Sequence, residues 1–418
     1  MRKKLSPHNL YRLFTFLIIS ACLSACSEPD NNFDRLLTLD PQVIPYVAQN
    51  HWVYATDVDG NILDVKKTNG REQLTLTSAR PVGKFNLTIV SSSVHTDGIT
   101  YINIETYADV DKGSTFAPIA GLGFSWSDSS SVDVKLNGYD GLPLAVWAAN
   151  RKICSVRKQT IVGGTFNANL IMRGSPSDLL LISYRNGIPV YAKMPGAKNG
   201  DQIELDMNNN FTPFEHQRKL DFEGYANYGS IAGAYLDNDG KLASLFLNFI
   251  DTHRLGDQAA MEQPRIGYID GFDTYMLNVT NAQPSGYVSY LKQGDIAASF
   301  ESFTMPTFSF KVLNTNLPAF AYQFSEDFTY YTANFKYETN TLSMHWKISA
   351  PQGRQITLGD IPAEIAAVHP RIRPISFEYH DCTLTKVISG DSYQESILRL
   401  QRDLSRDIEL YTFLPLNN

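Results

Sequence analysis

The sequence predicts an all-β protein that is built from tandem β-sandwich units behind an N-terminal export signal. Three observations support this prediction: a basic and then apolar N-terminus, short runs rich in Val, Ile, Thr, Tyr and Phe between turn residues, and a pattern that recurs along the chain. Hydrophobic residues make up 43% of the 418 residues and aromatic residues 12%, which is ample for packed cores. Since this length exceeds what one core usually serves, we expect several domains.

The first element is a removable export signal over residues 1–25. Basic residues without any acidic ones accompany the apolar run at residues 13–19, and small residues follow it. The run is shorter than the ~20 apolar residues that cross a bilayer, so we do not expect a permanent membrane helix. The basic residues are Arg2, Lys3, Lys4 and Arg12.

The signal ends in Leu23-Ser24-Ala25-Cys26, which resembles the lipobox of bacterial lipoproteins. The resemblance implies cleavage by signal peptidase II before Cys26, attachment of a diacylglyceryl group to the Cys26 sulfur, and acylation of the new N-terminus, with chains such as palmitate. Two or three acyl chains give stable membrane attachment, because each buried CH₂ group contributes about 0.8 kcal/mol. The alternative is an ordinary cleaved signal in which Cys26 has no role.

Residues 26–41 form the expected lipidated tether between the membrane and the folded part. In lipoproteins of bacteria with two membranes, an Asp after the acylated Cys commonly means retention in the inner membrane, so Ser27 favours the outer membrane. Residues 28–32 resemble the acidic patch that directs some lipoproteins to the cell surface. We therefore expect a protein anchored in the outer membrane, on its periplasmic or its cell-surface face.

The charge of the mature chain argues against nucleic acid as a partner. The whole chain has a formal net charge of -7, and removal of a signal with four positive charges and no negative ones lowers this value to -11. Such a chain repels the phosphate backbone instead of neutralising it. We expect no nucleic-acid ligand.

Strand patterns dominate the mature chain, and helical patterns are few. Asp-Gly and Asn-Gly pairs separate several strands, because they tolerate the positive φ of a tight hairpin. Residues 362–368 form a candidate helix, and residues 393–404 fit a helix or a strand. The clearest strands are residues 86–90, 100–106, 179–183, 275–279 and 307–312, with turns at Asp59-Gly60, Asp97-Gly98, Asn186-Gly187 and Asp239-Gly240.

Three features recur in the same order with a period of about 90 residues. They are an aromatic residue followed by Asp or Asn, an apolar strand followed by a Tyr-containing strand, and a Phe shortly before a Pro. The first aromatic residues are spaced by 93 and 88 residues, the apolar strands by 93 and 97, and the Phe residues by 95 and 92. The markers are Tyr54, Trp147 and Tyr235; Leu87, Leu180 and Leu277; and Phe116, Phe211 and Phe303.

A repeat of about 90 residues has room for seven short strands and resembles an immunoglobulin-like β-sandwich. In such a unit the recurring aromatic residues would fill the core, and the Pro would lie at an edge or a strand start. The expected β units are residues 42–141, 142–223, 224–327 and 328–418, of which the last lacks the clear markers. The alternative is one continuous fold of several sheets, in which the repeat only reflects strand length.

Apart from Cys26, the mature chain holds two cysteines, Cys154 and Cys382. An even number of cysteines in an oxidising compartment favours a disulfide. The unit boundaries argue against it, because Cys154 would lie in the second unit and Cys382 in the fourth. A bridge between them and two separate thiols both stay open, and Cys22 lies in the removed signal.

Catalytic patterns are mostly missing. Residues 123–127 (Gly-Phe-Ser-Trp-Ser) begin like a nucleophile elbow but lack its closing Gly and its strand-helix setting, so we expect a strand with a core Trp. Residues 378–382 combine Glu, His, Asp and Cys, but alternation along a strand would place His380 and Cys382 on one face and Asp381 on the other. We interpret both segments as structural and expect no catalytic residue.

Metal- and cofactor-binding patterns are also weak. The eight His residues include no pair four apart that would bind zinc on one helix face. Residues 57–61 and 237–241 resemble calcium loops, but Gly stands at the fourth position instead of the sixth, and no Glu stands at the twelfth. We interpret both as hairpin turns and expect neither a metal nor a cofactor.

Together these observations predict a non-enzymatic binding, adhesion or envelope-accessory protein. Its partners would be the bilayer, through Cys26, and a glycan or protein ligand, since exposed Tyr and Trp can stack on sugars or anchor an interface. One alternative is a glycan-processing hydrolase with two carboxylates about 5–10 Å apart in a cleft between units, and another is a structural spacer without a pocket. The candidate Trp residues are Trp52, Trp126, Trp147 and Trp346.

Overall fold

The structure is a computed structural model in which strands dominate and helices are short. This confirms the predicted all-β fold class. Each of the clearest predicted strands overlaps an observed one, and residues 363–368 form the helix predicted over residues 362–368. The described residues are 34–41, 50–116, 129–139, 145–148, 154–173, 175–186, 188–219, 227–236, 242–251, 265–283, 286–294, 308–388, 390–398 and 408–415.

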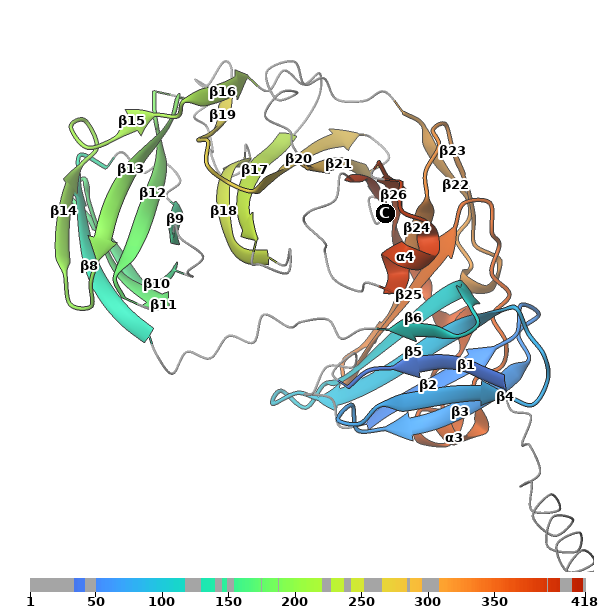
Figure 1. Ribbon diagram of the computed structural model, residues 1–418. Coiled ribbons are helices and arrows are strands. Elements are labelled where there is room, and N and C mark those ends of the chain that lie inside the picture. Colours follow the sequence, from blue (N-terminus) through green and yellow to red (C-terminus); the bar gives the residue numbers. More distant parts are fainter. Residues whose placement is uncertain are drawn as a thin grey trace, which may run out of the picture.

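A 12-stranded sheet runs through much of the molecule. Its strands follow one another along an arc, with β17 and β18 near one end and β2 and β3 near the other (Figure 1). In β24 and β25 buried residues alternate with partly exposed ones, so that one face of the sheet packs tightly and the other is more open. In sheet order the strands are β18 (Leu242–Asp251), β17 (Asn227–Leu236), β20 (Thr274–Gln283), β21 (Gly286–Gly294), β27 (Ile408–Pro415), β26 (Glu378–Val387), β24 (Tyr330–Thr339), β25 (Leu342–Pro351), β6 (Thr100–Asp111), β5 (Lys84–Val94), β2 (Asn50–Thr56) and β3 (Ile62–Thr68).

The pairing of β25 with β6 joins the N-terminal and C-terminal parts of the chain. The two strands run parallel, with Lys347 opposite Glu105, a residue 242 positions away in the sequence. Local patterns cannot predict such a distant pairing. The expected first, third and fourth units therefore share one sheet, and this part of the chain follows the alternative of a continuous fold.

Strands β8 to β15 form a β-sandwich of two four-stranded sheets. The side chains between the sheets make a core of their own, with Leu136, Phe166, Leu181 and Val190 among its members. This sandwich corresponds to the expected second unit, but its first strand begins at Ser129 instead of after residue 142. The two sheets are β10 (Cys154–Val162), β11 (Thr165–Arg173), β8 (Ser129–Asn137) and β14 (Gln202–Asp206), and β15 (Thr212–Pro213), β13 (Ile188–Ala197), β12 (Ser177–Arg185) and β9 (Ala145–Ala148).

Smaller elements cover parts of the large sheet. Leu37 packs in one core with Val53 and Phe85, and Phe310 contacts Phe413 with ring centroids 5.3 Å apart. These contacts cover parts of opposite faces of the sheet, because strand pairing places Val53 and Phe413 on different faces. The elements are β1 (Asp34–Leu39), β4 (Leu74–Ser78), β7 (Ser114–Phe116), β16 (His216–Lys219), β19 (Arg265–Tyr268), β22 (Phe310–Asn314), β23 (Ala321–Phe324), η2 (Leu317–Ala319), α3 (Ala363–Val368), η3 (Pro374–Ser376) and α4 (Tyr393–Leu398).

Aromatic side chains are core residues wherever the recurring markers are described. Tyr54, Phe116 and Phe211 are buried, as the repeat predicts. Trp52 and Trp346 are buried as well, so neither lies on an exposed aromatic strip. Trp126 and the side chains of Trp147, Tyr235 and Phe303 lie outside the described residues.

The helices that the structure describes are all too short or too polar to span a lipid bilayer.

Candidate binding groove

Seven hydroxyl side chains form one row across seven neighbouring strands of the large sheet. Each member lies directly opposite the next in the strand pairing, so the row runs perpendicular to the strands. Side chains that occupy paired positions point to the same face of a sheet. From β6 to β20 the row, which we call the hydroxyl row, contains Tyr107, Ser349, Thr332, Thr383, Thr412, Ser289 and Thr280.

Within the hydroxyl row, the Ser and Thr hydroxyls are hydrogen-bonded in pairs. The Oγ1 atom of Thr332 lies 3.0 Å from the Oγ of Ser349, and those of Thr383 and Thr412 lie 2.9 Å apart. Thr280 donates to Ser289 over 3.0 Å, and Ser289 donates to the Asn278 side-chain oxygen over 2.8 Å. A hydroxyl can donate once and accept twice, so each pair keeps capacity for further hydrogen bonds with a ligand.

The rows on either side of the hydroxyl row have different chemistry. On one side, the Lys347 ammonium lies 3.2 Å from Glu105, and the Asn334 amide donates to Asp381 over 2.6 Å. On the other side, strand pairing places mainly aliphatic and aromatic residues together with a few polar ones. These residues are Tyr330, Thr385, Leu410, Leu291 and Asn278 in the adjacent row, and Val387, Ile408, Gln293 and Met276 in the next.

These rows line a cavity of about 510 Å³, which we call the hydroxyl groove. This volume lies in the range of small-ligand sites. Lys347 is the one charged residue among the described residues that line it. The lining residues are Tyr107, Ser349, Thr332, Thr383, Thr412 and Ser289 from the hydroxyl row; Met276, Asn278, Leu291, Gln293, Tyr330, Lys347, Thr385, Val387, Ile408 and Leu410 from other strand positions; and Ser396 and Ile397 from α4.

Helix α4 forms one wall of the groove and begins with a capping box. The Ser392 N–H donates to the Glu395 carboxylate over 2.8 Å, and the Glu395 N–H donates to the Ser392 hydroxyl over 3.3 Å. This reciprocal pair satisfies two donors that would otherwise lack a partner at the helix start. A helix of one to two turns thereby becomes stable enough to hold Ser396 and Ile397 over the sheet.

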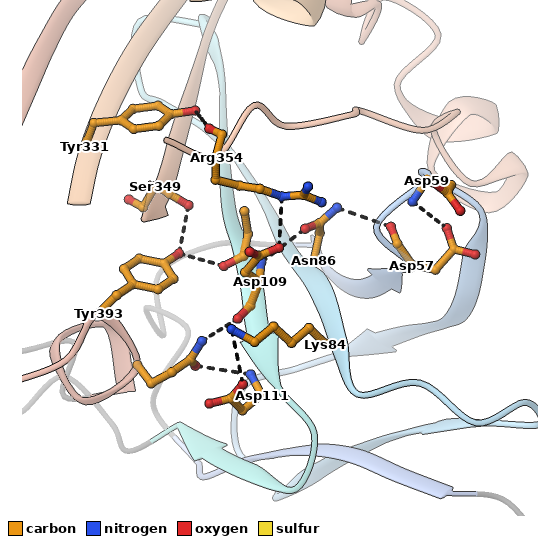
Figure 2. A network of polar contacts seen from close by, with 12 residues as sticks. Asp57, Asp59, Lys84, Asn86, Asp109, Asp111, Tyr331, Ser349, Arg354 and Tyr393 are labelled. Carbon is orange, nitrogen blue, oxygen red and sulfur yellow. Dashed lines mark hydrogen bonds and ion pairs between the residues drawn. The ribbon is translucent and has the colours of Figure 1, made fainter. Parts of the chain in front are cut away.

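A polar network fixes α4 to the end of β6 (Figure 2). The Tyr393 hydroxyl lies 2.8 Å from the carbonyl oxygen of Ala108 and 2.9 Å from that of Ser349. The Gln394 side chain donates to the Asp109 carbonyl oxygen and accepts from the Asp111 N–H over 3.1 Å. The wall of the groove is therefore attached to the same strands that carry the hydroxyl row.

Asp109 is the irregular point of β6 to which this network attaches. Its φ is +53°, in the left-handed region that few non-glycine residues adopt. The Arg354 Nε atom lies 3.0 Å from the Asp109 carboxylate, and the Asp109 N–H donates to the Asn86 side chain over 3.3 Å (Figure 2). These contacts compensate for the unfavourable backbone conformation.

The phenol of Tyr107 keeps its proton at neutral pH. Burial, followed by the neighbouring Glu105 carboxylate, raises the pKa of Tyr107 well above its usual value, and the hydroxyl donates to Glu105 over 2.5 Å. Since Lys347 also contacts Glu105, the charges at this end of the groove are paired. Further along the same side, burial raises the pKa of Asp381.

A disulfide between Cys154 and Cys382, one of the two alternatives that the sequence left open, is not formed in the structure. Cys382 is a free thiol, buried in the core beside Ala333, and burial raises its pKa well above the usual value. Cys154 begins β10 in the sandwich, in a different sheet, and its side chain lies outside the described residues. Cys26 also lies outside them.

Residues 378–382 are part of β26, and one detail differs from the strict alternation expected along this strand. His380 and Asp381 are neighbours on a strand, yet the imidazole Nε2 lies 3.7 Å from the Asp381 carboxylate. A β-bulge on the pairing with β24, between Asn334 and Phe335, disturbs the strict alternation here. The thiol of Cys382 stays protonated because of burial, so the group does not form a thiolate site.

The segment at residues 57–61 is a hairpin turn, as predicted. The Asp57 carboxylate accepts from the N–H groups of Asp59 and Asn61 and lies 3.0 Å from Arg80, so protein groups occupy its oxygens. Gly60 has a φ of +90°. Residues 237–241 and 123–127 lie outside the described residues.

One cluster of potential metal-binding side chains was not predicted from the sequence. Glu215, His216 and Asp270 bring one ligand-type atom each to within 4.8 Å of one another, and the His216 Nε2 atom lies 3.0 Å from the Asp270 carboxylate. The His216 ring stacks on Tyr268, which faces it across the β16–β19 pair. His216 and Asp270 lie 54 positions apart, so only the strand pairing brings them together.

No protein-family model matches this chain, and no curated protein is similar to it in sequence.

Proposed function

We propose that this protein is a non-enzymatic binding protein, anchored by lipid in the outer membrane, that holds its ligand in the hydroxyl groove. The lipobox at residues 23–26, the absence of Asp after Cys26, and the polar tether support the anchor. The observation that carries the binding role is the hydroxyl row, because seven aligned hydroxyls beside an apolar surface suit recognition of a ligand.

The lining of the groove favours binding over catalysis. Among its described residues there is no carboxylate, imidazole or thiol, so the acid–base pair that a glycoside hydrolase needs has no candidate there. A structural spacer, the other alternative, would have no need for a groove of about 510 Å³. An elongated, largely uncharged ligand fits these features best.

Photo-crosslinking in intact cells tests this proposal for a ligand of any chemical class. The photoreactive amino acid p-benzoylphenylalanine would replace Leu410, which lines the groove, and in a control variant Gln159, an exposed residue of the edge strand β10 in the sandwich. After irradiation, the purified protein would be digested and the peptide around each position analysed by mass spectrometry. We expect adducts at position 410 and none at position 159.

Two results would contradict the proposal. One is an unmodified peptide around position 410 in a protein that folds and reaches the envelope. The other is the same adducts at positions 410 and 159, since that result would indicate non-specific contact with abundant molecules.

A further inference from the structure

We infer that the ligand of the hydroxyl groove is an uncharged oligosaccharide that lies along the hydroxyl row, across the strands. This inference rests on the proposed binding role and adds the class and the orientation of the ligand. Four features of the groove support it: the kind of polar group, its repetition, the apolar surface beside it and the pairing of charges.

The polar groups in the groove match those of a sugar. Hydroxyls of Ser and Thr both donate and accept, as do the hydroxyls of a sugar, and Asn278 and Gln293 add side-chain amides. A peptide bound in extended form would instead require backbone N–H and C=O partners, which a sheet offers at its edge strands and not on its face. The face of the large sheet presents side-chain groups only.

The polar groups also repeat at a regular interval. Neighbouring strands lie about 4.8 Å apart, so six steps from β6 to β20 extend over about 29 Å. A chain of similar sugar units offers hydroxyls at a regular interval over such a length. A compact ligand would use only a fraction of the row.

The apolar side of the groove completes the match. Leu291 and Leu410 lie opposite each other in the row beside the hydroxyls, and Tyr330 ends that row. Sugar rings have C–H faces that pack on apolar and aromatic surfaces while their edges form hydrogen bonds. A fatty acyl chain would contact Leu291 and Leu410 but would leave the remaining hydrogen-bonding capacity of the hydroxyl pairs unused after it displaced water from them, at a cost in binding free energy.

The charges favour a neutral chain over an acidic one. Lys347, the charged residue that lines the groove, already contacts Glu105, and Asp381 lies two strands further on. The mature chain carries a formal net charge of -11, which repels anionic ligands. An acidic glycan would therefore meet a lysine whose charge is already paired with Glu105, and an unfavourable net charge at long range.

Calorimetric titration of the mature protein with defined oligosaccharides tests the inference. The probes are neutral oligomers of glucose, mannose and N-acetylglucosamine, each from monosaccharide to octasaccharide, and matched oligomers of uronic acids. We expect one neutral series to bind, with an affinity that rises with chain length and then reaches a plateau as the row becomes filled.

Two variants connect such binding to the hydroxyl row. The double substitution Thr383→Val and Thr412→Val removes one hydroxyl pair while it keeps the shape of both side chains, and should weaken binding about tenfold. Thr160→Val, on the outer face of the sandwich, makes the same chemical change elsewhere and should leave the affinity unchanged. Thermal unfolding of each variant would show that the fold is intact.

The outcomes separate this inference from the proposed function. Adducts at position 410 without binding of any neutral series, or binding of uronic acid oligomers alone, would overturn the inference and leave a binding role for the groove. Neutral oligosaccharides that bind equally to the double variant would overturn the inference as well, because their site would then lie elsewhere. An absence of both adducts and oligosaccharide binding would overturn both proposals.

Discussion

A hydrogen bond of 2.8 Å joins the Tyr393 hydroxyl to the carbonyl oxygen of Ala108, across 285 positions of the sequence. The same hydroxyl lies 2.9 Å from the carbonyl oxygen of Ser349, so one phenol connects α4 with two strands of the large sheet. Tyr393 is itself buried, and burial raises the pKa of its hydroxyl well above the usual value. The phenol therefore stays protonated and able to donate.

Tyr393→Phe should lower the free energy of unfolding by about 1–3 kcal/mol, because two buried carbonyl groups lose their shared donor without any change in packing. Urea denaturation followed by circular dichroism would measure the change. Tyr101→Phe is the matched control, since its hydroxyl has no comparable buried partner among the described residues, and should change stability by less than about 0.5 kcal/mol. Equal stability of the Tyr393→Phe variant and the parent would show that this contact does not hold α4.

A second prediction concerns the close contact between Gly359 and Gly60. A Cβ atom added to Gly359 would lie 1.7 Å from the Gly60 carbonyl oxygen, so the loop after β25 can only approach the β2–β3 turn without a side chain. Gly359→Ala should therefore destabilise the protein by about 1–3 kcal/mol or more.

Gly83 provides the control for this substitution. It has space around its Cα atom and no positive φ, so Gly83→Ala should be neutral or slightly stabilising. Thermal unfolding of both variants would measure the difference. If Gly359→Ala melted at the same temperature as Gly83→Ala, the loop would not pack against the turn as described.

Much of the local structure could be predicted from the sequence, because it depends on neighbouring residues. The turn at Asp59-Gly60 and the helix after Pro362 follow from residue types that favour those conformations. The hydroxyl row could not be predicted in this way. Thr383 and Thr385 alternate with Leu384 as on any strand with one polar face, and only the register with six other strands aligns Thr383 with Thr412 and Thr332.

The tandem-unit prediction failed in part for a related reason. The markers Leu87 and Leu277 each lie in the first strand of a hairpin, β5–β6 and β20–β21, so the repeat has a structural basis. A hairpin signal, however, does not indicate which strand pairs with its outer edge. In this protein β6 pairs with β25 and β21 with β27, and these two pairings merge the expected units into one sheet.

A pH dependence follows from Asp57. Its partial burial raises the pKa, but hydrogen bonds from Asn61 and Asp59 and the charge of Arg80 outweigh that effect and lower it below the usual value. A carboxyl whose pKa is lower in the folded state stabilises the fold above its unfolded pKa of about 3.9, and this contribution is lost as the pH falls through the folded pKa.

Asp57→Asn should therefore reduce stability at pH 7 by up to about 1 kcal/mol, and the difference from the parent protein should shrink as the pH falls below about 4. Urea denaturation at a series of pH values would measure it. Asp59→Asn is the control, because the Asp59 N–H makes the contact to Asp57 and its carboxylate does not. A difference that stayed constant across this pH range would contradict the assigned role of the carboxylate.

The final prediction concerns the lipid anchor. If Cys26 is the acylated residue, Cys26→Ser should abolish the incorporation of radiolabelled palmitate and release the protein from the membrane fraction. Cys22→Ser is a matched control, because this residue lies in the same signal and is removed on cleavage, so labelling should persist. Labelling that survived Cys26→Ser would exclude the lipobox assignment.

With the anchor established, protease treatment of intact cells would identify the membrane face on which the protein lies. Rapid loss of the protein would place the groove outside the cell, where it can capture an external glycan. Protection until the outer membrane is broken would instead indicate a ligand in the periplasm.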